Sequence, residues 1–562
     1  MTWGKRRAII ILIVVLIIGG IGCLAVVAPT HIPSKSVLLI DVNGSIQEQR
    51  EEDLFTAFGN ATPVQHDYTD SIDAAATDPR IAGLVVRIGP LDTGWAKLEE
   101  IHSHLLSFRK SGKPSVCYLG YDGIGNAEYY LATGCSDIWI VPTAPVSIHG
   151  MMAEAMFFRG TLDKLKIVPE FYHIAEYKTA GNTFTEKKFT PAHKEEVEGL
   201  LDGIYGQFLT EAAQSRGLDR EQFQKLVEAG PLSTSDAVTD KLVDREAYWD
   251  QVQDYFRKQI GQWNPISLAR YHNSLSTGDG QEIAVIHATG LIESGQSGTT
   301  PGGGFIMGGD SVAKDIRTAR EDSSIKAIIL RIDSGGGSAV ASEVIRREVE
   351  LARAKKPVVV SMSDVAASGG YWIAMGANRI VAEPDTITAS IGVLTGKFNI
   401  AGLYSLLGMS TDSVTTSENS TFYSDQQNFT PAQRAAVMKM LNETYANFTK
   451  GVAEGRHLPL DEVDRIGKGR VWTGAQAKDL KLVDQLGGLD TAVNAAKELA
   501  NIPASEQVRI ELFPREKTFF ELLLEKQRDQ MSQTLTLDET LKHLVGMMDP
   551  VQARMPFELR IR

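Results

Sequence analysis

Apolar and polar positions alternate in blocks along most of this chain. The clearest block starts with an apolar run at 327–332, followed by a glycine-rich turn, a helical pattern over 339–354 and a second apolar run at 357–361. Short apolar runs bounded by glycines are typical of strands buried in a parallel sheet. Strands that alternate with helices in this way predict an α/β fold with crossover connections.

A turn of small residues follows the second strand of this block. Ser368 lies in Ala-Ala-Ser-Gly-Gly, just ahead of an apolar helix that we expect to begin near Gly369. A hydroxyl at a helix N-terminus lies near free N–H groups that favour a developing negative charge. The glycines at 335–337 have no Cβ, so a second backbone N–H can approach the same point. The pattern indicates an oxyanion hole; a tight structural turn is the alternative. A Gly-x-Ser-x-Gly elbow is excluded because Ala366 holds the first glycine position.

The N-terminus carries an uncharged apolar run at 8–28, preceded by the basic residues 5–7. At 1.5 Å per residue this run reaches roughly 30 Å, enough to cross a bilayer core. A cleaved signal peptide is the alternative, but Pro29 follows the one plausible cleavage site. The basic flank places residues 1–7 in the cytoplasm and the rest of the chain outside it. We therefore predict a single-pass inner-membrane protein whose bulk is periplasmic or otherwise extracytoplasmic.

The remainder of the sequence contains an internal repeat of about 240 residues. Residues 38–46 match 284–292, and Phe-Thr-Pro-Ala recurs at 189 and 429, with an offset that drifts only from about 246 to 240. Such long-period similarity indicates duplication of one structural unit. The predicted domains are a stub and transmembrane anchor, an N-terminal repeat, a C-terminal repeat and a helical tail with an amphipathic pattern at 519–531; their bounds are 1–30, 31–275, 276–505 and 506–562.

Composition argues against a nucleic-acid-binding protein, a disulfide-rich scaffold and a metalloprotein. The net charge of −13 argues against a nucleic-acid partner, because nucleic-acid-binding proteins are usually basic. Three cysteines are too few for a disulfide scaffold, and spacing alone does not decide whether Cys117 and Cys135 pair. The eleven histidines form no His-x-x-x-His pair. No metal site and no cofactor is predicted.

Alignment of the two halves of the sequence shows that each half lacks one polar residue that the other half has. Asn126 falls opposite Ser368, so the first half lacks the hydroxyl, whereas Lys178 falls opposite Glu418, so the second half lacks the lysine. A single composite site shared by the two halves explains both losses. The alternative is that Lys178 is a solvated surface residue, as most lysines are.

The chain resembles the long, duplicated form of the signal peptide peptidase A family, which are membrane-anchored Ser–Lys proteases of the S49 type. The resemblance covers roughly 36–500 and is carried by motifs at 358–373, 333–338, 388–392 and 176–178. It implies tandem domains related to crotonase and Clp protease. It also implies hydrophobic peptide substrates, such as cleaved signal peptides, and a ring-like homo-oligomer, with a tetramer as the suggested size.

Carried over residue by residue, the resemblance makes Ser368 the nucleophile and Lys178 the general base. The oxyanion hole would come from the N–H groups of Gly369 and Gly336. Ser390 would support the lysine by hydrogen bonding to its amine; the alternative is a helix or turn serine that caps the backbone. A neutral lysine is required, and burial between the halves can lower a lysine pKa by up to about 3–5 units. The family usually has Ser-Pro-Gly-Gly where this chain has Ser-Gly-Gly-Gly at 334–337, so Gly336 is a choice among three glycines.

Two other functions fit parts of the pattern. A non-catalytic membrane scaffold on the same fold would have no use for a buried lysine beside a serine. A crotonase-type acyl-CoA enzyme would share the fold, but it would need neither the Ser–Lys pair nor an anchored body outside the cytoplasm.

Overall fold

The computed structural model describes most of the chain between residue 31 and residue 515, together with two short strands near the C-terminus; the described ranges are 31–50, 62–122, 124–275, 280–300, 304–515, 552–554 and 560–561. The apolar run at 8–28 and the amphipathic pattern at 519–531 lie outside them. Among the helices that are described, none combines the length and apolar character needed to cross a bilayer.

The first repeat is built on a six-stranded parallel sheet. Its strand order is β7-β4-β3-β2-β1-β8. The central strands are apolar on both faces because helices cover both sides, which is typical of parallel sheets. The strands are β1 (Ser36–Gly44), β2 (Ile81–Leu91), β3 (Ser115–Leu119), β4 (Asp137–Ile140), β7 (Arg245–Glu246) and β8 (Pro265–Ser267).

The second repeat contains a sheet with the same order of equivalent strands, β20-β16-β15-β13-β9-β21. Two further strands, β17 (Ile387–Ala389) and β19 (Val471–Thr473), extend it beside β15. The six equivalent strands are β9 (Gln281–Thr289), β13 (Ile325–Ser334), β15 (Val358–Ala367), β16 (Arg379–Ala382), β20 (Gln485–Leu486) and β21 (Val508–Phe513). The predicted strand–helix–strand block at 327–361 is therefore confirmed.

Helices follow the same duplicated plan. Helices α3 (Trp95–Arg109) and α13 (Ala339–Arg353) both have 15 residues. Helices α7 (Pro191–Arg216) and α16 (Pro431–Arg456) both have 26 residues and begin with a threonine N-cap followed by proline, which explains the recurring Phe-Thr-Pro. The other helices of the first repeat are α2 (Gln65–Thr77), α4 (Asn126–Ala132), α5 (Arg159–Lys164), α6 (Asn182–Thr185), α8 (Arg220–Ala229), α9 (Thr234–Thr239), α10 (Trp249–Ile260) and α11 (Leu268–His272). Those of the second repeat are α12 (Gly309–Glu321), α14 (Gly369–Ala374), α15 (Ala401–Leu406), α17 (Leu460–Ile466), α18 (Gly474–Asp479) and α19 (Leu489–Leu499).

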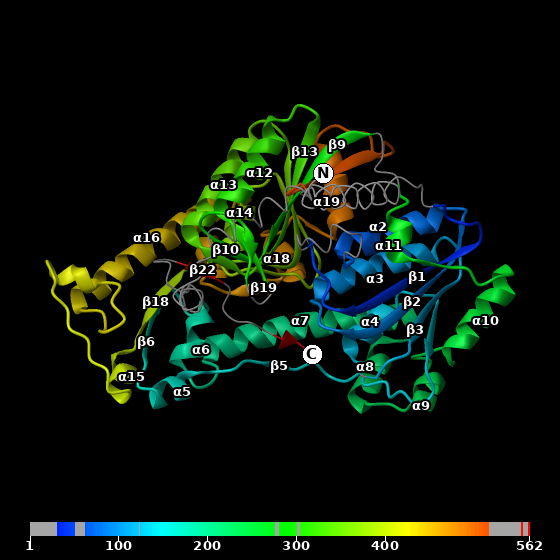
Figure 1. Cartoon of the computed structure of the whole chain (residues 1–562), viewed down its shortest axis with the longest axis horizontal. Helices are drawn as coiled ribbons and strands as arrows, with labels where there is room; N and C mark the ends of the chain where they lie inside the picture. The colour runs from blue at the N-terminus through cyan, green and yellow to red at the C-terminus, as the bar shows by residue number, and fades with distance from the viewer. Residues whose placement is uncertain are drawn as a thin grey trace, which may run out of the picture.

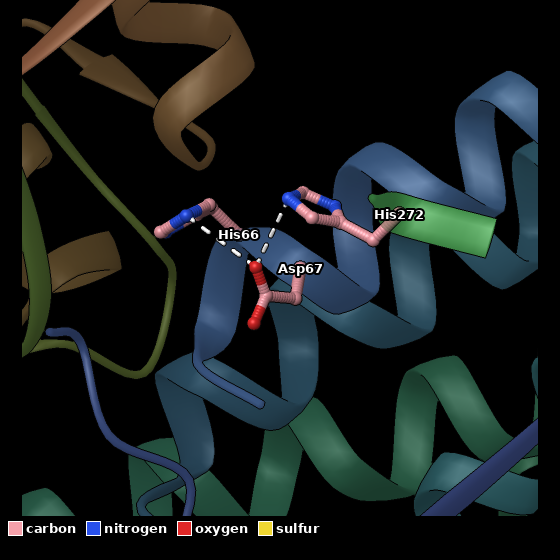
Figure 2. A group of neighbouring side chains, drawn as sticks. All are labelled: His66, Asp67 and His272. Atoms are coloured by element: carbon pink, nitrogen blue, oxygen red, sulfur yellow. Dashed lines mark ion pairs between the residues drawn. The ribbon is translucent and has the colours of Figure 1, made fainter. Parts of the chain in front are cut away.

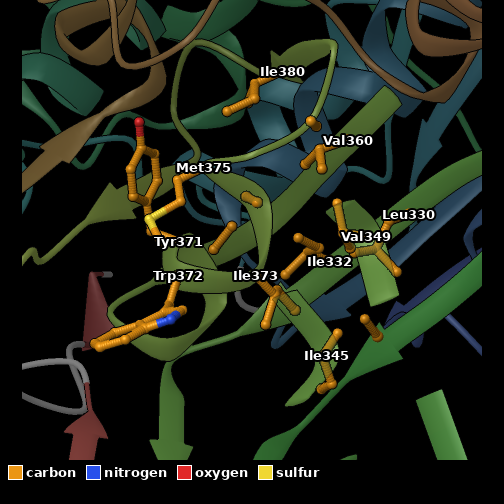
Figure 3. Close-up of a cluster of buried hydrophobic side chains, with 14 of the residues drawn as sticks. Leu330, Ile332, Ile345, Val349, Val360, Tyr371, Trp372, Ile373, Met375 and Ile380 are labelled. Atoms are coloured by element: carbon orange, nitrogen blue, oxygen red, sulfur yellow. The ribbon is translucent and has the colours of Figure 1, made fainter. Parts of the chain in front are cut away.

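The core of the second repeat packs around the short helix α14. Figure 3 shows Tyr371, Trp372 and Ile373 of this helix beside side chains from β13, β15 and α13. Tyr371 is fully buried, and its hydroxyl donates to the Leu482 carbonyl at 2.8 Å. This packing fixes α14, and with it the residue that precedes the helix, Ser368.

Part of the first repeat reaches across the second. In Figure 1 the segment from α5 to α7 (cyan to green) runs beneath the strands of the second repeat. Strand β6 (Val168–His173) pairs antiparallel with β18 (Leu394–Asn399), so the two repeats share a seven-stranded sheet. Its order is β11-β12-β10-β14-β22-β18-β6, in which the remaining strands are β10 (Leu291–Glu293), β11 (Gly298–Thr299), β12 (Phe305–Gly308), β14 (Gly336–Ser338) and β22 (Gln552–Arg554). This crossing carries Lys178 into the second repeat.

The C-terminal region differs from the helical tail that the sequence predicts from residue 506. Strand β21 pairs parallel with β9 and closes the second sheet as β8 closes the first, so the repeat continues past residue 505. Strand β22 joins the shared sheet, and β23 (Arg560–Ile561) pairs with β5 (Ala153–Glu154). The sequence prediction missed β21 because the similarity between the repeats is weak at this edge strand.

Candidate active site

Ser368 lies between the end of β15 and the start of α14, as the small-residue turn predicts. Its side chain is fully buried, and its φ of 55° falls in a region that non-glycine residues rarely adopt. Its N–H donates to the Ala389 carbonyl at 2.7 Å, which helps to hold this backbone conformation. Strained backbone of this kind is often found at active sites, where the surrounding structure aims a reactive side chain.

Lys178 reaches Ser368 from the first repeat. It follows β6 and directly precedes a short 3₁₀ turn, and its side chain is fully buried. Its Nζ lies 2.6 Å from Ser368 Oγ, 2.9 Å from Ser390 Oγ and 3.2 Å from the Ser390 carbonyl oxygen. The structure therefore brings together the serine and the lysine that the two halves of the sequence hold separately, and it does so within one chain.

The environment of Lys178 favours its neutral form. Burial lowers the pKa of the Lys178 ammonium well below its ordinary value, and only the nearby Glu196 opposes this effect. Burial also raises the pKa of Glu196 to about 8, against hydrogen bonds that stabilise its charged form, such as the one from the Val471 N–H. Because burial raises the pKa of Glu196 above the ordinary glutamate value, its carboxylate opposes the neutral form of Lys178 less than an ordinary glutamate would.

A glycine of the second repeat positions the Lys178 backbone. Gly469 has a φ of +84°, and a Cβ at this residue would lie 2.5 Å from Lys178 N. The Tyr177 N–H also donates to the Lys468 carbonyl at 3.1 Å, next to this glycine. Gly469 was not among the predicted site residues; in the sequence its one distinguishing feature is a second glycine nearby, at Gly467.

Ser390 contacts the lysine directly. Its Oγ donates to the Gly469 carbonyl at 3.3 Å, so the oxygen is oriented to accept from Lys178 Nζ. A neutral Lys178 amine has two hydrogens and one lone pair. If both hydrogens are donated to the Oγ and the carbonyl oxygen of Ser390, the lone pair is left for the Ser368 hydroxyl.

We expect Ser390→Ala to reduce kcat about 10- to 100-fold with little change in KM, because misplacing a positioned group typically costs this much. The measurement is steady-state peptide hydrolysis. The matched control is Ser342→Ala on α13, which removes a buried hydroxyl that donates to the carbonyl of Ser338, the N-cap residue of that helix. Wild-type kcat in Ser390→Ala would show that its hydroxyl does not orient the base.

The two glycines proposed for the oxyanion hole differ in their hydrogen bonding. The Gly369 N–H belongs to the first turn of α14, where amides have no partner within the helix. The Gly336 N–H instead donates to Ser334 Oγ at 3.1 Å. Gly370 packs against the Ser334 carbonyl: a Cβ added to Gly370 would lie only 2.7 Å from that oxygen. The turn at 334–337, called the glycine loop below, is therefore in contact with the start of α14.

Two groups of side chains in the described part of the chain have the composition of a metal site: His66, Asp67 and His272, and the partly exposed group Asp73, His104 and Asp490. His66 and His272 direct their rings toward Asp67 (Figure 2), with Nε2 atoms 3.5 and 3.2 Å from Asp67 Oδ1. Arg50, however, places Nη2 2.7 Å from Oδ1 and 2.9 Å from Oδ2 of the same carboxylate. The guanidinium neutralises Asp67 and would repel a divalent cation, so we interpret this group as an ion pair flanked by imidazoles.

Comparison with known proteins identifies the family. The sequence model of peptidase family S49 matches the chain twice, at 107–262 and 350–503. The chain belongs to peptidase family S49. The chloroplastic serine protease SPPA of Arabidopsis thaliana is 34% identical over 92% of this chain and 77% of its own length. Protease 4 of Salmonella typhi is 33% identical over 88% of this chain and 82% of its own length.

This S49 chain is therefore a serine protease with two S49 domains in a mixed α/β fold. The predicted relation to Clp protease stays a prediction. The structure of a ClpP1 mutant from Listeria monocytogenes aligns with a TM-score of 0.24 at 14% identity, over 36% of this chain and 91% of that one. Membership of a peptidase family favours proteolysis over the acyl-CoA chemistry that the sequence left open.

Proposed function

We propose that this S49 protease is a membrane-anchored endopeptidase with a Ser–Lys dyad, in which Ser368 is the nucleophile and Lys178 the general base. The observation that carries the proposal is the 2.6 Å separation of Lys178 Nζ and Ser368 Oγ, both fully buried. A lysine serves as a base only when it is neutral, and burial lowers the pKa of Lys178 in the direction required.

The reaction proceeds by acyl transfer. Ser368 Oγ attacks the carbonyl carbon of the scissile peptide bond while its proton passes to Lys178 Nζ. The C–N bond then breaks, and the departing amine takes that proton from Lys178. Water, deprotonated by the neutral lysine, attacks the acyl-enzyme; the Ser368 ester bond breaks, and the serine regains its proton as the carboxylic acid leaves.

The negative charge on the tetrahedral intermediate requires N–H donors. Gly369 is the first donor, since its amide lies at the start of α14 beside the nucleophile. Gly336 is the second, provided that substrate binding releases its N–H from Ser334 Oγ. Removing one oxyanion-hole donor typically costs about 10²–10³ in kcat.

The shared sheet supports binding of an extended peptide. Strand β22, from the C-terminal part of this chain, pairs antiparallel with β14, so that Ala553 lies opposite Gly337, and it also pairs with β18 at Leu394. An extended segment is thus accepted between the strand that contains Gly336 and the strand that follows Ser390. Addition of a peptide as a strand to a sheet is a common recognition mode.

A fluorophosphonate probe combined with peptide mapping tests the chemistry. We expect the probe to modify Ser368 in the wild-type protein and not in Ser368→Ala. Absence of labelling on a folded wild-type protein would favour the scaffold alternative. Cleavage of apolar signal-peptide remnants at a higher kcat/KM than polar peptides of equal length supports the proposed substrate class; equal rates would contradict it.

The cellular location is part of the proposal. Residues 8–28 would anchor the protein in the inner membrane, with the amino end in the cytoplasm and the body outside. The disulfide between Cys117 and Cys135, with Cα atoms 5.6 Å apart, supports an oxidising compartment. Protease added to cells with a permeabilised outer membrane should degrade the body, and full protection would contradict this topology.

The proposal also includes a homo-oligomer, with a tetramer as the size suggested by the family resemblance. Because Ser368 and Lys178 meet within one chain, oligomerisation is not needed to complete the dyad. Light scattering of the detergent-solubilised protein tests the assembly; a monomer that retains full activity would remove the oligomer from the account.

A further inference from the structure

Helix α3 of the first repeat points its N-terminus at the catalytic strands of the second. A helix usually receives a cap from a side chain at its N-cap residue, but that residue here is Gly94. Asp364 takes over this role from the second repeat, and its Oδ1 accepts from the Lys97 N–H at 3.0 Å. A Cβ on Gly94 would lie 2.2 Å from Asp364 Cγ, so only glycine lets the carboxylate approach.

The Lys97 side chain extends the same contact. Its Nζ lies 2.6 Å from Asp333 Oδ2 and 3.1 Å from Asp364 Oδ2, and its side chain is only 7% exposed. Asp333 Oδ1 in turn accepts from the Val365 N–H at 3.2 Å. One buried ammonium from the first repeat therefore connects the ends of two adjacent strands of the second, β13 and β15.

These two strand ends lead directly to the catalytic groups. Asp333 directly precedes Ser334, whose Oγ accepts from the Gly336 N–H and donates to the Gly290 carbonyl at 2.6 Å. Asp364 lies four residues before Ser368 in the strand that ends at the nucleophile. A shift between the two strand ends would change the distance between the nucleophile and the glycine-loop N–H.

The duplication provides an internal comparison. Helix α13 occupies the place of α3 in the second repeat, and its third residue, equivalent to Lys97, is Ala341. Ala341 donates its N–H to the local N-cap, Ser338 Oγ, at 3.3 Å. A conventional cap is therefore sufficient for this helix, and the lysine is present only on the helix that faces the catalytic strands.

We propose that Lys97 is a positioning residue for catalysis, which holds the nucleophile strand and the glycine loop in register through Asp364 and Asp333. This inference rests on the proposed Ser–Lys function. Without the ammonium, two partly buried carboxylates would face each other, and their repulsion would separate the strand ends. The ion pairs of Lys97 with Asp333 and Asp364 therefore also fix the distance between the nucleophile and the glycine-loop N–H. This distance matters because small misplacements of reacting groups cost about 10²-fold in rate.

The test compares Lys97→Met and Lys97→Arg with wild-type protein. We expect Lys97→Met to lower kcat and the rate of Ser368 acylation by a fluorophosphonate about 10- to 100-fold, with KM changed less than about threefold. Lys97→Arg keeps a cation that bridges two carboxylates, so it should recover most of the lost rate.

The control is Lys113→Met, in the turn after the same helix. Lys113 Nζ donates to the carbonyls of Ala75 and Asp78 at 2.7 and 2.6 Å, entirely within the first repeat. Its loss should lower Tm without lowering the acylation rate of the folded protein. Rates are measured well below the Tm of every variant, where a defect due only to unfolding disappears and a positioning defect persists.

The experiment distinguishes failure of the proposed function from failure of the role proposed for Lys97. Wild-type protein that is folded but not acylated at Ser368 would overturn the proposed function itself. Normal acylation of wild-type protein with an equal rate in Lys97→Met would overturn only the role of Lys97. A rate loss that Lys97→Arg does not restore, or that Lys113→Met reproduces at equal loss of Tm, would assign Lys97 a purely structural role.

Discussion

Replacement of Lys178 with methionine is expected to lower kcat about 10³-fold or more, because general-base catalysis contributes typically 10²–10⁴-fold and no other base contacts Ser368 among the described contacts. Ser368→Ala should be at least as damaging, and the double variant should be no worse than the more damaging single variant, since the two residues act as one unit. The measurement is steady-state hydrolysis of an apolar peptide by each variant.

The control for this prediction is Lys356→Met. Lys356 Nζ donates to the Ala319 carbonyl at 2.9 Å and to that of Asp322, at the edge of the second repeat away from Ser368. This variant should keep wild-type kcat. Mixing Ser368→Ala with Lys178→Met protein should restore no activity, because the two groups meet within one chain. Restored activity would show that the dyad forms between chains.

Lys178→Met should also stabilise the fold at neutral pH. The folded protein depresses the pKa of Lys178, so between that value and about 10.4 the unfolded chain binds the extra proton. The free energy of unfolding therefore increases with pH in this window, and at neutral pH the wild-type protein bears a penalty that the variant lacks. A higher Tm together with lost activity would separate a catalytic defect from misfolding.

Gly469→Ala is the second change with a large expected effect. The new Cβ would lie within 2.7 Å of both N and Cα of Lys178, at a φ of +84°, so the backbone carrying the lysine must move. A displacement near 1 Å at a catalytic group costs about 10²-fold in rate, and we expect a loss of kcat of that size or greater.

Gly217→Ala separates this steric effect from backbone strain. Gly217 also has a positive φ, +64°, as the C-cap of α7, but a Cβ there meets no atom within 4 Å. Both variants should lose roughly 1–2 kcal/mol of stability from the left-handed conformation, whereas only Gly469→Ala should lose activity. Equal, near-wild-type kcat in the two would mean that Lys178 tolerates the shift.

The sequence predicts the fold most successfully where strands are short, apolar and bounded by glycine. The first strand and the helix that lead to Ser368 appear close to their predicted bounds, because continuous apolar runs of this length are stable only when buried. The second strand begins where predicted but continues to Ala367, six residues beyond its predicted end at 361. The prediction failed at the start of the C-terminal tail, where β21 was expected to be helical. Strand β21 is half-buried at a sheet edge, so its sequence contains only a weak apolar pattern.

The Ser–Lys pair of the candidate site was predictable from the sequence for a different reason, the comparison between the two repeats. Duplication turned the missing serine at Asn126 and the missing lysine at Glu418 into a visible complementarity. Local pattern did not reveal Gly469 and Lys97, because their effects depend on contacts between residues about 240–290 positions apart. The partner of the Gly336 N–H, Ser334 Oγ, likewise depends on the rotamer of one side chain.

The central claim is that a buried, neutral Lys178 activates Ser368. The most direct test is the rate of Ser368 acylation by a fluorophosphonate as a function of pH, in wild-type protein and in Lys178→Met. We predict that the wild-type rate rises with pH to a plateau, through an apparent pKa well below the ordinary lysine value, and that Lys178→Met reacts at least about 10²-fold more slowly and without this titration. The same rate and the same titration in both proteins would contradict the account.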